Sequence, residues 1–237
     1  VLDGAWWEDS SYHGVTLHRI VLFGYALYRQ KGINIFENTN LRAMFDWYVK
    51  THTPKDKTTI HTNTQGYYEG YRGVSTLSNG YSLIPVYGDN SYKIFNEGIL
   101  ATAAIMYEKT DPEFAGRLMW AWKRLGELEP FKDWWWLIDR DIESIPQELE
   151  SYVNWERGQA LLRSDFNTPD EKWFFLFSGR LPVGGSHHAN DWNSISLYAY
   201  GYPLMLNQGV IRDENNNRIR ETRQKTTVMF GGRDQVR

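Results

Sequence analysis

The run SISLYAYGYPLMLNQG at residues 194–209 is the clearest structural pattern in this sequence. Two short runs rich in β-branched and aromatic residues flank Gly201, which is typical of strands joined by a tight turn. Three further runs of this kind lie between turn-forming residues, namely QALLRS (159–164), KWFFLFS (172–178) and KTTVMF (225–230). We therefore predict antiparallel strands from Gly158 onwards, with DENNN (213–217) as a hairpin tip.

The first half of the chain has the apolar spacing of amphipathic helices instead. Asp111-Pro112 has the pattern of an N-cap followed by a first-turn proline. Residues 51–92 lack periodicity and predict a long loop, a feature that is often functional. Helices are predicted at about 10–31, 36–49, 96–109 and 112–126.

The composition of the 237 residues excludes several classes of protein. Lys and Arg number 26 and Asp and Glu 29, so a net charge of −3 argues against a nucleic-acid binder. Without cysteine there is no disulfide framework, thiolate metal site or cysteine nucleophile. No apolar run is long enough to span a membrane. The 11 Trp, 15 Tyr and 11 Phe favour a carbohydrate ligand, because flat rings stack on sugars as well as filling cores.

Two segments combine residue types that carry chemistry. DGAWWEDSSYHG (3–14) places Tyr12 and His13 at the start of a helix, and GGSHHANDWNS (184–194) places polar side chains before a strand. A tyrosine at a helix start is more often structural than catalytic. For the polar cluster, the structural and functional interpretations are evenly balanced.

The motifs in these segments resemble the heparinase II/III-type polysaccharide lyases. This family pairs an (α/α) toroid with an antiparallel β-sandwich, so the resemblance implies an α+β chain with a toroid portion at 1–150 and a sandwich portion at 151–237. We also expect the chain to be a fragment of a larger protein. The matching residues are Asp3-Gly4, Glu8 and Tyr12; Pro85, Gly88 and Asp89; Arg163-Ser164; and Ser186-His187, Asp191, Ser194, Leu197-Tyr198, Gly201, Pro203-Leu204 and Gly209.

The resemblance implies β-elimination at a uronic acid, with an acidic polysaccharide as substrate. Tyr12 takes the position of the catalytic tyrosine, and His187 that of a histidine acting as base or as neutraliser of the substrate carboxylate. The family's upstream Asn-His pair has no counterpart here. Candidate substrate contacts are Trp7, His13, Arg19, Tyr67, Tyr71, Arg72, His188 and Asn190.

The resemblance also implies a structural zinc in some relatives, but the corresponding positions here are Ala189, Asn207 and Lys225. Alanine has no donor atom, asparagine is a weak ligand and lysine is normally protonated. We therefore expect no metal and no other cofactor. Asp191 is retained, either to fix a local turn or to orient His187.

The expected partners follow from the same reasoning: a polysaccharide, but no nucleic acid and no membrane, with the oligomeric state left open. A periplasmic or secreted location is implied by the resemblance alone. Two alternatives remain at this stage. One is a non-catalytic carbohydrate-binding relative. The other is a glycoside hydrolase on a similar toroid, which would need two carboxylates from among Glu8, Asp9 and Asp89.

Overall fold

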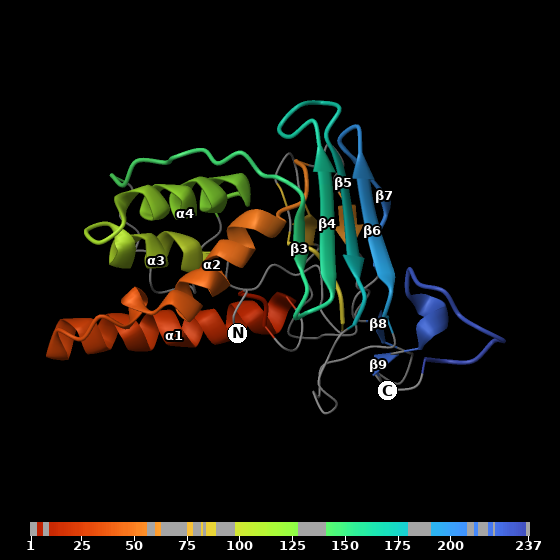
Figure 1. The fold of residues 1–237 in the computed structure, drawn as a ribbon, viewed down its shortest axis with the longest axis horizontal. Helices are drawn as coiled ribbons and strands as arrows, with labels where there is room; N and C mark the ends of the chain where they lie inside the picture. Colours follow the sequence, from red (N-terminus) through yellow and green to blue (C-terminus); the bar gives the residue numbers. More distant parts are fainter. Residues whose placement is uncertain are drawn as a thin grey trace. The chain divides into compact units, whose positions relative to one another are not determined.

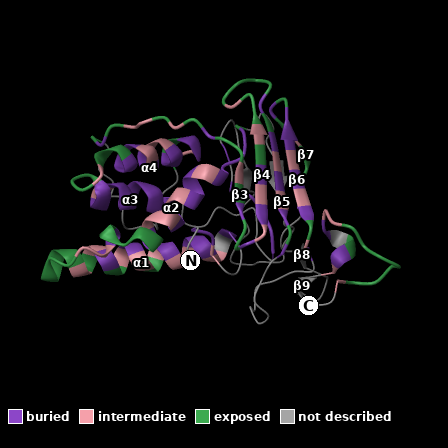
Figure 2. Ribbon diagram, viewed as in Figure 1, coloured by how far each residue is buried: buried purple, intermediate pink, exposed green. Residues whose placement is uncertain are grey.

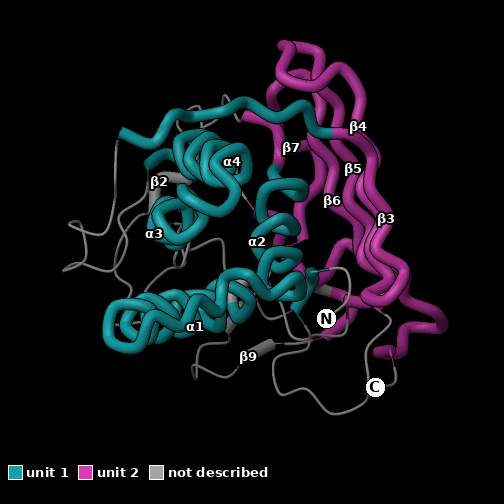
Figure 3. Tube along the Cα trace, turned by 60° about the vertical axis from the view of Figure 1, so that its left-hand side comes forward, with its two compact units in different colours: residues 1–6, 12–52, 95–149 teal, residues 7–11, 53–94, 150–237 magenta. Residues whose placement is uncertain are grey.

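The computed structural model has helices followed by an antiparallel sheet (Figure 1), so the fold class is α+β, as predicted. The chain divides into two compact units (Figure 3): a helical unit, residues 1–6, 12–52 and 95–149, and a sheet unit, residues 7–11, 53–94 and 150–237. Within the described segments, no helix combines the length and apolarity needed to cross a bilayer. The structure describes residues 4–6, 10–55, 60–62, 75–77, 82, 84–88, 98–127, 141–179, 191–207, 211–212, 218–219 and 221–235.

The helices lie close to their predicted places, with one correction. The helix predicted from Phe36 is a 3-10 turn followed by a separate α-helix. The division falls at Asn38, whose side-chain oxygen accepts hydrogen bonds from the amides of Asn40 (2.9 Å) and Leu41 (3.2 Å) and so caps the second element. The elements are α1 (Ser10–Lys31), η1 (Ile35–Glu37), α2 (Thr39–Thr51), α3 (Gly98–Tyr107) and α4 (Pro112–Arg124).

Aromatic rings fill the core of the helical unit. Tyr107 at the end of α3 makes edge-to-face contacts with Phe36, Phe45 and Phe114, at centroid distances of 5.8, 6.1 and 4.9 Å. Such pairs are favourable beyond the area they bury. The unit is therefore closed by contacts between η1, α2, α3 and α4.

The sheet unit contains a five-stranded antiparallel meander in the order β3-β4-β5-β6-β7. The turn between β6 and β7 has positive φ at both Tyr200 (58°) and Gly201 (79°), as a type I′ hairpin turn requires. Pro203 is tolerated because β7 is an edge strand. The strands are β3 (Tyr152–Asn154), β4 (Gln159–Ser164), β5 (Lys172–Phe177), β6 (Ser194–Ala199) and β7 (Tyr202–Met205), with the smaller pairs β1 (Ile60–Thr62) with β2 (Ser75–Leu77) and β8 (Ile211–Arg212) with β9 (Arg218–Ile219).

Residues along β4, β5 and β6 alternate between a buried face and a more exposed one (Figure 2). On the buried face, the Tyr87 ring packs against Phe175 and Phe177, at centroid distances of 5.9 and 4.6 Å. The other side, which we call the open face, is also apolar. Its paired rows are Ala160, Leu176 and Ile195, and Leu162, Phe174 and Leu197.

The prediction of a strand at 225–230 was wrong. In this region the structure has a 3-10 turn, η4 (Thr222–Gln224), followed by bends, and only Phe230 makes an isolated bridge, to Arg233. The segment is bonded to β6 at Ile195, whose amide donates to the Thr226 carbonyl (3.0 Å). From Leu197 onwards β7 occupies that edge of β6, so no ladder can continue.

Candidate functional site

Tyr12 lies in the first turn of α1 and is partly exposed. The helix dipole favours negative charge in this turn, and the turn contains no acidic side chain. Arg19 follows Tyr12 by seven residues, nearly two helical turns, which places both on one side of α1. Arg19 is exposed, and its role as a substrate contact stays a prediction.

His13 lies in the helical core rather than at a surface. It is fully buried, and its ring packs against Trp47 (4.9 Å between centroids) and Tyr48 (4.8 Å) of α2. This position suits a residue that fixes the start of α1 against α2. Direct contact between His13 and substrate stays a prediction.

His18, next to Arg19, has a perturbed protonation equilibrium. Burial lowers the pKa of His18, and the positive charge of Arg19 lowers it further. The neutral imidazole is therefore favoured in the folded protein.

Several predicted site residues lie outside the described residues, and their roles stay predictions. The group includes the proposed catalytic histidine and most of the aromatic candidates for stacking on sugar. These residues are Trp7, Tyr67, Tyr71, Arg72, His187, His188 and Asn190.

A buried polar cluster follows the His187 segment, at the start of β6. Asp191 is 1% exposed, and its Oδ2 accepts hydrogen bonds from the amide of Gly88 (2.6 Å) and from Nδ2 of Asn207 (2.9 Å). The same Asn207 nitrogen donates to Ser194 Oγ (3.1 Å). Burial raises the pKa of Asp191, whereas the charge of Lys225 and the hydrogen bonds from Gly88 and Asn207 oppose that rise. We call Gly88, Asp191, Ser194, Asn207 and Lys225 the Asp191 cluster.

Residues 84–88 connect this cluster to the start of α1 within the sheet unit. The Ser10 hydroxyl donates to the Pro85 carbonyl (2.6 Å), and three residues later the Gly88 amide reaches Asp191. In the sequence, Tyr12 comes two residues after Ser10, and His187 comes four residues before Asp191. Residues 84–88 are therefore bonded to two residues of the sheet unit, one shortly before Tyr12 in the sequence and one shortly after His187.

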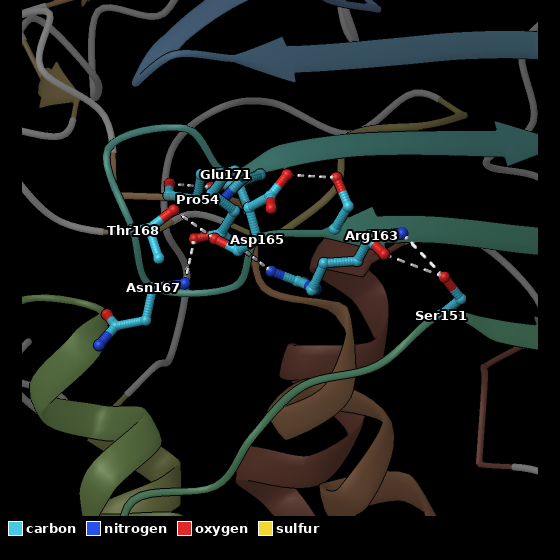
Figure 4. A network of polar contacts seen from close by, with 9 residues as sticks. Pro54, Ser151, Arg163, Asp165, Asn167, Thr168 and Glu171 are labelled. Atoms are coloured by element: carbon cyan, nitrogen blue, oxygen red, sulfur yellow. Dashed lines mark hydrogen bonds and ion pairs between the residues drawn. The ribbon is translucent and has the colours of Figure 1, made fainter.

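Arg163, one of the residues that match the family motif, makes contacts within the sheet unit (Figure 4). Its guanidinium forms an ion pair with Glu171, and the two side chains are 1% and 4% exposed. Glu171 also accepts a hydrogen bond from the Asn167 amide (3.0 Å), while Ser151 Oγ accepts one from the Arg163 amide (2.9 Å). These contacts hold the β4–β5 connection and leave the Arg163 charge buried.

Sequence reasoning identified Asp191 but missed its partners. It considered Asn207 and Lys225 as poor zinc ligands, not as partners of Asp191, and it gave Gly88 no role beyond the motif. Their common feature is burial of polar groups, which a single sequence does not reveal. Among the described residues, no group of three or more His, Cys, Asp or Glu side chains is placed to hold a metal.

Comparison with known proteins gives a match at the level of fold. No family model matches the sequence, and no curated protein matches it significantly. Heparan sulfate lyase HepC from Pedobacter heparinus superposes with a TM-score of 0.57 at 14% identity, covering 94% of this chain and 29% of that one. A heparinase III structure gives 0.58 at 14% identity, covering 94% and 31%. The resemblance to heparinase-type lyases is therefore confirmed for the fold, and the chain spans less than a third of these structures.

Proposed function

We propose, from the fold shared with solved heparan sulfate lyases, that this chain is part of a polysaccharide lyase. Its substrate would be a uronic-acid-containing polysaccharide, and its products a shortened chain and a 4,5-unsaturated uronate end. The observation that carries the proposal is the match over 94% of this chain to these structures. The position of Tyr12 in the first turn of α1 supports it.

The chemistry explains why such an enzyme needs these residue types. The proton on C5 of a uronate is weakly acidic, because its removal adds charge beside a carboxylate. Hydrogen bonds or positive charge on that carboxylate stabilise the carbanion-like transition state. A base removes the C5 proton, the C5 electron pair forms the C4–C5 double bond, and an acid protonates the departing O4.

In this proposal Tyr12 protonates the leaving oxygen and His187 acts as base or neutralises the carboxylate. A phenolate formed at Tyr12 would lie in the first turn of a helix, where the peptide dipoles favour an anion. Ser10 and Asp191, which lie close in sequence to the two residues, are each hydrogen-bonded to residues 84–88. The remaining candidates would contact sugar.

We also propose that the helices are part of an (α/α) toroid within 1–150 and that the sheet is one layer of a β-sandwich within 151–237. The apolar open face supports the second assignment, since a sheet that is apolar on both faces needs a layer on each. The periplasmic or secreted location rests on the resemblance alone.

The test is ultraviolet absorbance of the unsaturated product, with the full-length protein and a panel of uronate polysaccharides. We expect absorbance to grow on at least one substrate, and Tyr12→Phe to reduce the rate at least 100-fold by removing the proton donor. Tyr28→Phe, on the same helix and 40% exposed, is the matched control and should keep its activity.

Two outcomes would count against the proposal. Binding of a polysaccharide with no growth in absorbance on any substrate would favour the carbohydrate-binding alternative. New reducing ends without ultraviolet absorbance would indicate hydrolysis, because hydrolysis forms no conjugated double bond.

A further inference from the structure

The Asp191 cluster contains a buried carboxylate whose negative charge has to be balanced. Asp191 is buried, and its Oδ1 has no hydrogen-bond partner among the described residues. A buried carboxylate is costly unless it is paired. Gly88 and Asn207 offer only neutral donors, so the cluster needs a cation.

In some members of the family that this chain resembles, a structural zinc lies at the corresponding positions, but these side chains do not fit a metal. The amide nitrogen of Asn207 faces Asp191 Oδ2 and Ser194 Oγ, whereas a metal would be bound by an amide oxygen. Lys225, at another of those positions, is itself positively charged and would repel a metal ion.

Backbone contacts hold the Lys225 segment against Ile195, next to Ser194 of the cluster. The Lys225 amide donates to the Thr222 carbonyl (3.0 Å). At the next residue, the Thr226 carbonyl accepts from the Ile195 amide (3.0 Å), and Thr226 Oγ1 donates to the Ile195 carbonyl (2.5 Å). Lys225 is only 8% exposed, and its charge acts on Asp191.

We propose that the ammonium group of Lys225 is the resident cation of this sheet unit, filling the electrostatic role that a metal has in related lyases. The ammonium balances the Asp191 carboxylate and holds together three segments that are distant in sequence: residues 84–88, the start of β6 with Asn207, and residues 222–226. The inference does not depend on catalytic activity.

The first test is the thermal unfolding midpoint of Lys225→Met, which keeps the length of the side chain and removes its charge. Because the carboxylate of Asp191 then remains buried without a cation, we expect the midpoint to fall by roughly 10 °C. The matched control is Lys172→Met in the same unit, which removes an exposed ion pair with Asp165 and should shift the midpoint by less than about 2 °C.

The double variant Asp191→Asn with Lys225→Met removes both charges. We expect the double variant to recover at least half of the fall in unfolding midpoint that Lys225→Met causes. If Lys225→Met alone does not fold, we expect the double variant to fold. A double variant no more stable than the single variant would overturn the proposal, because the loss would then be one of packing.

Chelation provides the complementary measurement. Incubation of the wild-type protein with EDTA should leave its unfolding midpoint unchanged, and added zinc should not raise it. A fall with EDTA that zinc reverses would overturn the proposal, since a metal would then supply the charge that we assign to Lys225.

Discussion

At the scale of single residues, the His18–Arg19 pair gives a prediction that separates electrostatics from substrate binding. Arg19→Gln removes the positive charge that helps to lower the pKa of His18, so that pKa should rise towards its ordinary value. Histidine ring resonances followed by NMR titration measure this directly. Arg29→Gln, on the same helix, is the control and should leave the His18 titration unchanged.

The sign of the accompanying stability effect follows from linkage. Because the folded-state pKa of His18 lies below 6.5, its contribution to stability is present above that pH and is lost as the pH falls through the folded-state pKa. In Arg19→Gln the two pKa values lie closer together, so the acid-induced loss should be smaller. An unchanged His18 titration would show that Arg19 does not act on this imidazole.

Residue types in motifs were enough to select Tyr12 and Asp191 from the sequence, but not to describe their surroundings. The sequence placed His13 at the start of a helix but did not reveal that its ring packs against Trp47. The partners of Asp191 lie 103 residues before it at Gly88 and 16 residues after it at Asn207. Spacing along one sequence cannot reveal such contacts.

At the scale of elements, the apolar pattern was enough to predict where helices form. Where each helix begins and ends depended on its capping residues. The apolar pattern ran through Phe36, but Asn38 takes extended backbone angles and caps α2, which splits the pattern in two. Asp111 was recognised as a cap because proline follows it. Residues 225–230 have the composition of a strand, but β7 already occupies the edge of β6 with which they would pair. Composition alone does not show whether a strand edge is free.

Gly116 in α4 gives a prediction in which packing reverses a helix propensity. Alanine is ordinarily favoured over glycine in a helix by about 1 kcal/mol. A Cβ at Gly116 would, however, lie 2.5 Å from the Ile145 side chain and 2.8 Å from the Glu143 carbonyl. We therefore expect Gly116→Ala to lower the free energy of unfolding by about 1–3 kcal/mol, measured by denaturant titration.

A compensating substitution tests the cause. Adding Ile145→Ala to Gly116→Ala removes the side-chain clash, so the double variant should lose less than the two single changes would together. A Gly116→Ala variant more stable than wild type would show that residues 143–145 yield easily to α4.

At the scale of the whole chain, the order of helices before strands was readable because each period is local. Which residues make up each compact unit could not be read from the sequence. Residues 53–94 precede α3 in the sequence but belong to the sheet unit. Their link to the sheet rests on contacts such as Tyr87 with Phe177 and Gly88 with Asp191, which join residues about 90 to 100 positions apart.

The open face of the sheet yields a prediction for the full-length protein. Leu162 lies on this face and is 54% exposed here, and Ile33, after α1, is 53% exposed as a single apolar residue. If a second layer covers the open face, Leu162→Asp buries a charge and should lower the thermal unfolding midpoint by at least 5 °C. Ile33→Asp, matched in exposure, should lower it by less than about 2 °C. Equal small effects in the full-length protein would mean that the face stays open to solvent, and the sandwich assignment would then fail.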